Sequence, residues 1–299
     1  MTLSSHTDWG FFYCTDARNI HDFPCTQNSC FFKSLETYLF SPSRAILFLR
    51  IAFVYNKEKG GLNMTYEEVM EKLEQFGSEQ TKKTFARHGA KEPFFGVKVG
   101  DLKKHFVKEV KKDQQLVYDL YASGNSDAMY LAGLAVKPKE MTKERLNEWV
   151  DGAYWHMISE YTVAQVAAES PFALELAREW MRSDDEMIAV AGWSTYSNYL
   201  SIAPDEEVEQ AEVEKLLQQV KETIHEERNR VRYVMNNFVI CVGAYYKPLS
   251  ERAKEAAAFI GSVHVDVGRT ACKVPLATAY IQKMEDRNAV GKKRKTCIC

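Results

Sequence analysis

The sequence lacks the features that define several large classes of protein. It contains no uninterrupted run of the roughly 18–20 apolar residues that a membrane-spanning helix needs, because Arg50 interrupts the longest candidate, residues 45–55. With only 8 prolines and 15 glycines among 299 residues, it also has little of the turn chemistry of a loop-rich β protein. The first residues show no basic segment with a cleavage site, so we expect no secretory signal.

Cysteine and histidine patterns exclude a second group of proteins. The 7 cysteines form no Cys-x-x-Cys pair, and no His-Glu-x-x-His motif or Cys/His cluster has metal-ligand spacing. Seven cysteines in so long a chain are typical of reduced thiols, not of a disulfide framework. We therefore expect a cytoplasmic protein that has neither a structural metal nor a cofactor and makes no contact with membranes.

What is present is an ordinary globular composition, with 45% hydrophobic and 27% charged residues and a net charge of −2. Residues 1–63 differ from the rest, since they hold eight of the 16 phenylalanines and show no long amphipathic period. The codons of Gly60-Gly61 can read as a bacterial ribosome-binding sequence just before Met64. We expect translation to start at Met64 and residues 1–63 to be a non-native, poorly ordered leader; the alternative is a variable N-terminal extension.

From residue 64 onward, apolar residues recur at helical spacing. Thr65 and Glu68 have the spacing of a capping box, and residues 213–224 place apolar side chains on one helix face. Alternating strand patterns are nearly absent, and residues 263–267 are the single short candidate. The sequence therefore predicts an all-α domain over residues 64–287, followed by a basic C-terminal tail over residues 288–299.

The predicted helices come in pairs. Helical hairpins are expected at 114–135, 142–169, 171–200, 205–246 and 249–284, with starts that are 28 to 44 residues apart. Stacked hairpins that each bury an apolar face on the next are typical of a helical-repeat solenoid. We expect such a HEAT-like α-α superhelix, curved, with a concave binding face. An irregular helical bundle is the alternative.

Charge is unevenly distributed along the chain. Residues 82–112 carry ten basic and three acidic residues, a net charge of +7, whereas residues 205–227 carry nine acids and two lysines, a net charge of −7. Lys104, Lys108, Lys111 and Lys112 are expected to fall on one helical stripe. Such a basic stripe releases counterions from a phosphate backbone, so it indicates nucleic-acid binding; a solvated helix face is the alternative. The predicted DNA contacts in these basic regions are Lys98, Lys103, Lys104, Lys108 and Lys111, with Lys292, Lys293, Arg294 and Lys295 in the tail.

One segment adds a family resemblance to this charge pattern. Residues 92–104, EPFFGVKVGDLKK, resemble the N-terminal motif of the DNA alkylation repair family. Gly133, the Tyr154-Trp155 pair and residues 231–236 and 266–275 look like a bacterial subgroup of the same family. The resemblance covers residues 66–295 and implies a stack of HEAT-like repeats that binds double-stranded DNA.

The resemblance also implies an activity, the release of cationic alkylated purines such as 3-methyladenine and 7-methylguanine by an N-glycosylase. An aromatic face and a carboxylate would stabilise the oxocarbenium-like sugar. Trp155 matches the aromatic position, but the family's catalytic aspartate falls on Ser159, so Glu160 is the candidate substitute. The second tryptophan of the family falls near Asn236 or Asn237 and is missing.

These matches define the remaining candidate residues. Trp155 and Glu160 are the catalytic candidates, with a core tryptophan and a solvated or paired acid as the alternatives. Further DNA-binding candidates are Tyr154, His156, Ser159, Arg232 and Asn236. Arg232 and Asn236 are four residues apart on one predicted helix and could face one groove, or form an intrahelical polar pair.

Two functional classes stay open at this point. The chain is expected to be a DNA-binding, nucleoid-associated bacterial monomer, with or without glycosylase activity. The alternative is a non-catalytic HEAT-like scaffold that binds unusual DNA structures or a protein partner on its concave face. Release of methylated bases would indicate the enzyme, and salt-sensitive binding without release would indicate the binder.

Overall fold

Residues 64–298 are the part of the chain that the structure, a computed structural model, describes. The expected leader over residues 1–63 lies outside these residues. The described region is helical, with fifteen α-helices: α2 (Tyr66–Phe76), α3 (Glu79–Arg87), α4 (Val99–His105), α5 (Val107–Val110), α6 (Gln114–Ala122), α7 (Ser126–Ala135), α8 (Lys143–Asp151), α9 (His156–Ile158), α10 (Ala164–Ala168), α11 (Ala173–Trp180), α12 (Glu186–Ile202), α13 (Gln210–Thr223), α14 (Asn229–Tyr245), α15 (Ser250–Ile260) and α16 (Ala277–Asp286).

Four short turns complete the described elements. Three are 3₁₀ turns, η1 (Pro138–Glu140), η3 (Asp205–Glu207) and η4 (Lys247–Leu249). The fourth, η2 (Ser159–Val163), is a π-helical turn that joins α9 to α10. None of the helices in residues 64–298 is both long enough and apolar enough to pass through a bilayer.

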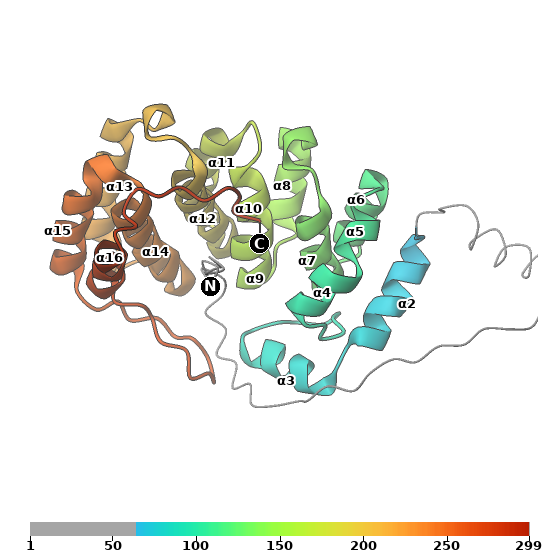
Figure 1. The fold of residues 1–299 in the computed structure, drawn as a ribbon. Coiled ribbons are helices and arrows are strands. Elements are labelled where there is room, and N and C mark those ends of the chain that lie inside the picture. The colour runs from blue at the N-terminus through green and yellow to red at the C-terminus, as the bar shows by residue number, and fades with distance from the viewer. Residues whose placement is uncertain (1–63, 299) are drawn as a thin grey trace, which may run out of the picture. The chain divides into compact units, whose positions relative to one another are not determined.

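The paired helices follow one another in chain order along an arc (Figure 1). Second helices of successive pairs pack on each other, α10 on α12, α12 on α14 and α14 on α16, while among the first helices α13 packs on α15. The HEAT-like solenoid predicted from the sequence is therefore confirmed. The expected hairpins coincide with α6–α7, α8–α10, α11–α12, α13–α14 and α15–α16.

Local sequence explains where these helices begin. Thr65 and Glu68 form the capping box that their spacing predicts: Thr65 Oγ1 accepts from the Glu68 N–H at 3.3 Å, and Glu68 Oε2 accepts from the Thr65 N–H at 3.1 Å. Asp113, Asn125 and Asp185 cap α6, α7 and α12 through side-chain oxygens. Each cap satisfies backbone donors that the first turn of a helix leaves free.

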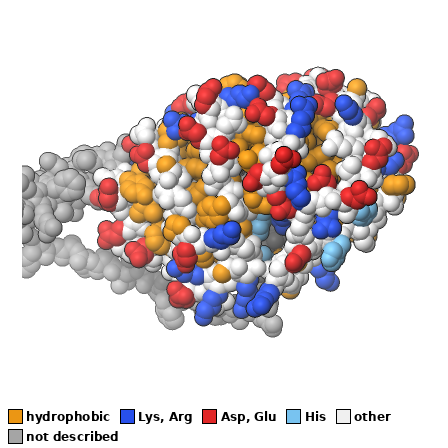
Figure 2. Space-filling view, turned by 180° about the vertical axis from the view of Figure 1, so that it is seen from behind, with side chains coloured by type: hydrophobic (Ala, Val, Ile, Leu, Met, Phe, Trp, Pro, Cys, Tyr) orange, Lys and Arg blue, Asp and Glu red, His pale blue; other side chains and the backbone are white. Residues whose placement is uncertain are grey.

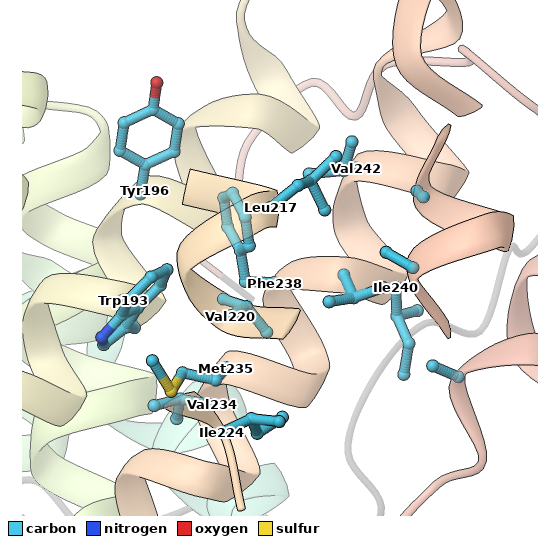
Figure 3. Close-up of a cluster of buried hydrophobic side chains, with 14 of the residues drawn as sticks. Trp193, Tyr196, Leu217, Val220, Ile224, Val234, Met235, Phe238, Ile240 and Val242 are labelled. Carbon is cyan, nitrogen blue, oxygen red and sulfur yellow. The ribbon is translucent and has the colours of Figure 1, made fainter. Parts of the chain in front are cut away.

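The largest fully buried side chains include Trp193 and Tyr196 of α12 and Phe238 of α14 (Figure 3). The Phe238 ring makes edge contacts with Trp193 and Tyr196 at centroid distances of 5.3 and 5.8 Å. Gly192 lets α12 approach α11, because a Cβ at this position would lie 2.4 Å from the Met181 backbone nitrogen. Tight packing between consecutive repeats thus depends on aromatic and very small residues together.

The strand candidate at residues 263–267 is not a strand in the described structure, since this segment has no β-ladder partner. Burial nevertheless alternates along this segment as predicted. Val263 and Val265 are buried in the core cluster that includes α14 and α15, while His264 and Asp266 are exposed. The period-2 pattern therefore reports an extended segment lying on helices. Asn229 holds it in place by bonding both the N–H and the C=O of Asp266 at 2.8 Å.

Candidate nucleic-acid interface

The predicted lysines of the basic segment all lie at the surface. Leu102, Phe106 and Val110 are buried where α4 and α5 pack against α7. The exposed basic side chains on these elements are Lys98, Lys103, Lys104, Lys108 and Lys111. We call these five residues the lysine segment.

Lys104, Lys108, Lys111 and Lys112 do not lie on one continuous helix, contrary to what their spacing suggested. The helix breaks at Phe106, whose φ of −125° and ψ of −46° depart from helical values, so α4 ends at His105 and α5 begins at Val107. The apolar side chain of Phe106 is fully buried at this break. Acidic, basic and apolar side chains are interspersed on the face seen in Figure 2.

The Phe-Gly-Val motif is held by an aspartate in the next hairpin. Asp127 of α7 accepts hydrogen bonds from the backbone N–H groups of Phe95, Gly96 and Val97 at 2.6, 2.9 and 2.9 Å. Burial raises the pKa of the Asp127 carboxyl, although these three bonds act in the opposite direction. Asp127 therefore fixes the loop of residues 95–97, which leads into the lysine segment.

Trp155, a catalytic candidate, is buried beside the end of α3. Only 4% of it is exposed, its Nε1–H donates to the His88 carbonyl at 2.8 Å, and its ring lies 5.6 Å from that of Phe85. The neighbouring Tyr154 is half-buried and donates from its hydroxyl to the Lys91 carbonyl at 3.2 Å. Both aromatic side chains thus connect the α8–α9 loop to the N-terminal part of the domain.

Glu160, the other catalytic candidate, forms a buried ion pair with Arg230 at the start of α14. Arg230 donates from Nε to Oε1 of Glu160 and from Nη2 to Oε2 at 2.9 Å. The Glu160 and Arg230 side chains are 3% and 15% exposed, and the guanidinium carbon lies 3.9 Å from the centre of the Tyr233 ring. Burial lowers the pKa of Arg230, but the Glu160 carboxylate outweighs this and raises it.

Two residues that precede Glu160, His156 and Ser159, are also enclosed. Burial, followed by the Arg230 cation and then by His88, holds the pKa of His156 well below its ordinary value, so the imidazole is neutral near pH 7. Ser159 is fully buried and donates from Oγ to the Ala153 carbonyl at 3.2 Å. Because η2 is a π-helical turn, residues 159–163 have wider spacing than an α-helix, a feature often found at functional positions.

Arg232 and Asn236, which were expected to face one groove or to form an intrahelical pair, have different hydrogen-bond partners. Arg232 Nη2 approaches Asn229 Oδ1 at 3.4 Å, whereas Asn236 is buried and donates to the Pro275 carbonyl at 2.8 Å. The Asn236 bond therefore connects α14 to the segment that precedes α16. No sequence pattern reveals the Glu160–Arg230 pair, which joins residues 70 positions apart.

The basic tail runs back over the second helices, and Figure 1 shows its course from α16 toward α10. Its backbone donates from Gly291 to the Ala244 carbonyl and from Arg294 to the Ser201 carbonyl. Lys293 lies 2.9 Å from Asp205, and Cys297 is buried beside Gln165 and Glu169. Of the four predicted basic residues of the tail, Lys292 and Lys295 are exposed, whereas Lys293 and Arg294 are partly buried.

A row of paired helices with an exposed lysine segment defines the protein class as a HEAT-like repeat protein. The family model described as "DNA alkylation repair enzyme" matches residues 69–265. The chain belongs to this DNA alkylation repair family, as the sequence resemblance predicted.

Three similar proteins support the assignment. Uncharacterized protein Lin0241 of Listeria innocua and uncharacterized protein Lmo0209 of Listeria monocytogenes are 37% and 38% identical over 229 residues, which is 75% of this chain and 99% of each relative. A solved structure, 40% identical with a TM-score of 0.73, covers 79% of this chain and 100% of its own. It is described as belonging to "a new family of proteins related to the HEAT-like repeat DNA glycosylases with affinity for branched DNA structures".

Proposed function

We propose that this protein binds branched DNA through the lysine segment and the exposed lysines of its tail, without removing bases. The observation that carries the proposal is the match over the full length of a solved structure described as having affinity for branched DNA. At 40% identity, that match includes the same stack of helices. We further propose that the protein acts as a monomer at the nucleoid of a bacterial cytoplasm.

The charges are suited to the arms of a branched molecule. Lys104 and Lys108 lie at the surface on two separate short helices, α4 and α5, and exposed lysines bind phosphates by releasing condensed counterions. Such contacts carry no sequence information and position the protein on the duplex. Recognition of a branch therefore depends on how several arms lie against the protein.

The buried pair argues against base excision. A carboxylate that stabilises a developing sugar cation must face the substrate in the transition state. Both oxygens of Glu160 accept from Arg230, and only 3% of the side chain is exposed. Trp155 has no exposed face to offer either, since it is 4% exposed.

Base excision is the second candidate function, because the matching family model is described as a DNA alkylation repair enzyme. We expect no release of 7-methylguanine or 3-methyladenine when the protein is incubated with methylated DNA and free bases are measured by chromatography. Release that is lost in Glu160→Gln would establish the glycosylase and overturn the proposal.

The lysine segment is tested by charge reversal. We expect the double variant Lys104→Glu, Lys108→Glu to bind a four-way junction roughly tenfold or more weakly in a gel-shift assay, with a shallower dependence on salt, because each phosphate contact adds about 1 to the salt slope. The matched control is Lys139→Glu, Lys215→Glu, which makes the same change in net charge at two exposed positions outside the segment.

Two results would contradict this proposal. Equal losses in both double variants would show that net charge, not the lysine segment, determines binding. Equal affinity of the unmodified protein for a junction and for a linear duplex of the same length would show that branching is not recognised. The scaffold alternative would instead be supported if neither the unmodified protein nor the Lys104→Glu, Lys108→Glu variant bound DNA and the variant still bound a protein partner.

A further inference from the structure

A cavity of about 200 Å³ lies between η2, α12 and α14 and is bordered by the C-terminal tail. Its wall includes Glu160 of the buried ion pair and reaches α16. Other side chains in the wall are those of Tyr161, Ser197, Asn198, Asn237, Tyr280 and Arg294. Of these wall residues, Glu160 and Arg294 were also predicted from the sequence to act in catalysis or DNA binding.

The size of the cavity limits what it could hold. Pockets for drug-sized ligands are typically about 300–1,000 Å³, so a space of about 200 Å³ accommodates a single small ring system. The wall combines apolar and polar side chains, with aromatic rings at Tyr161 and Tyr280, both partly exposed. A flat heterocycle that stacks on an aromatic ring fits this description.

The polar groups of the wall suit the edge of a nucleobase. Asn198 donates from Nδ2 to the Ser194 carbonyl at 2.9 Å and Ser197 donates from Oγ to the Trp193 carbonyl at 2.8 Å. These bonds use donors, so the oxygens of both side chains keep the capacity to accept, while Asn237 adds a second amide. A nucleobase edge presents donors and acceptors together, and exposed bases are recognised by such hydrogen bonds and by stacking.

The charges around the cavity suit a base that is still attached to a DNA strand. Glu160 and Arg230 neutralise one another, and Arg294 from the tail adds a guanidinium to the wall. The tail segment that carries Arg294 is fixed on α12 through its backbone bond to Ser201 at 2.8 Å. Arginine guanidinium groups bind phosphate, so this wall suits a base that is still attached to a DNA strand.

We propose that the cavity receives one unpaired nucleobase from the branch point of a bound DNA molecule. This inference rests on the proposed binding of branched DNA and adds a site for the base. A base that is already unpaired at a branch enters a protein pocket at least cost, because no base pair has to be broken. The site would thereby distinguish a branch from a continuous duplex.

Photo-crosslinking tests the location of the base. A three-way junction that carries 5-iodouracil at an unpaired branch-point position is bound to the full chain, irradiated and analysed by mass spectrometry. We expect an adduct on Tyr161 or Tyr280, and no such adduct when 5-iodouracil lies in a paired arm. Adducts found only outside the cavity overturn the inference.

Binding measurements test the energetic role of the base. Replacing the branch-point nucleotide by an abasic residue should weaken binding roughly tenfold, the order expected for loss of one stacked base. Asn237→Leu should abolish most of this difference, whereas Gln219→Leu, at an exposed position of α13, should preserve it. Should Asn237→Leu fail to fold, Ser197→Ala gives the same comparison.

The two proposals fail in different ways. If the unmodified protein forms no complex with any junction in the gel-shift assay, the proposed function fails and the inference fails with it. If junctions bind but the intact and abasic branches bind equally, only the nucleobase site is overturned.

Discussion

At the scale of single residues, the buried pair between Glu160 and Arg230 is the feature that most changes the interpretation of the site. The sequence identifies Glu160 by its position next to Ser159, but it cannot show that a cation from another repeat occupies both carboxylate oxygens. Contacts between residues 70 positions apart depend on how the helices stack. Residue types and spacing therefore locate the site without giving its chemistry.

Breaking this pair should destabilise the protein. We expect Glu160→Ala to lower the free energy of unfolding by about 3 kcal/mol or more, because it leaves the Arg230 guanidinium buried without its counterion. Urea unfolding followed by circular dichroism measures the change. The double variant Glu160→Leu, Arg230→Met should recover most of the loss; a double variant as unstable as Glu160→Ala would show that packing, not the uncompensated charge, is responsible.

His156 should make stability depend on pH. Its pKa in the folded protein lies well below the ordinary value through burial and the nearby Arg230, so below about pH 6.5 the unfolded chain binds a proton that the folded chain does not. Stability is therefore full above the unfolded pKa and declines as the pH falls toward the folded pKa. Urea unfolding between about pH 7.5 and 5 should show a shallower decline for His156→Gln, and equal slopes would contradict the assignment.

At the scale of helices, the sequence predicts pairing well and continuity poorly. The hairpins follow from periodic apolar residues, whose burial against the next helix is local and repeated. Lys104, Lys108 and Lys111 were expected on one helix, but the helix breaks at the buried Phe106 into α4 and α5. Alternation at residues 263–267 predicts a strand. In the structure this segment packs against helices instead of pairing with another strand, and tertiary packing determines which of the two occurs.

Close packing between α11 and α12 gives a prediction at this scale. We expect Gly192→Ala to destabilise the protein by about 1–3 kcal/mol, the usual cost of overpacking, because the new Cβ would lie 2.4 Å from a backbone nitrogen that cannot rotate away. Gly100→Ala in α4 is the control, since a Cβ added there would have no atom of another element within 4 Å. Thermal unfolding of the two variants compares them directly, and equal melting temperatures would contradict the close contact.

At the scale of the whole described region, the sequence predicts both the stack of repeats and its basic segment, but not the path of the tail. The tail contains the basic residues 292–295, whose composition suggests an extended DNA-binding arm. In the structure Lys293 instead pairs with Asp205, and Cys297 packs beside α10. A polybasic composition does not reveal that a backbone will dock on other helices.

Docking of the tail predicts a long-range effect on dynamics. We expect Glu169→Ala to increase hydrogen exchange in residues 291–298, because the Glu169 carboxylate accepts from the N–H groups of Cys297 and Ile298. Exchange measured by mass spectrometry in α6 and α7, which are distant in the row, serves as the internal control. Unchanged exchange in the tail would show that Glu169 does not hold it.

The tail also sets a limit on how this architecture can vary. Its backbone contacts α14 at Gly291 and α12 at Arg294, and Cys297 reaches α10, so it advances one helix every three residues. Three extended residues span about 10 Å, close to the spacing of about 8–10 Å between packed helices. Insertion of another hairpin between α10 and α16 would therefore require about three additional tail residues, which couples repeat number to the length of the C-terminus.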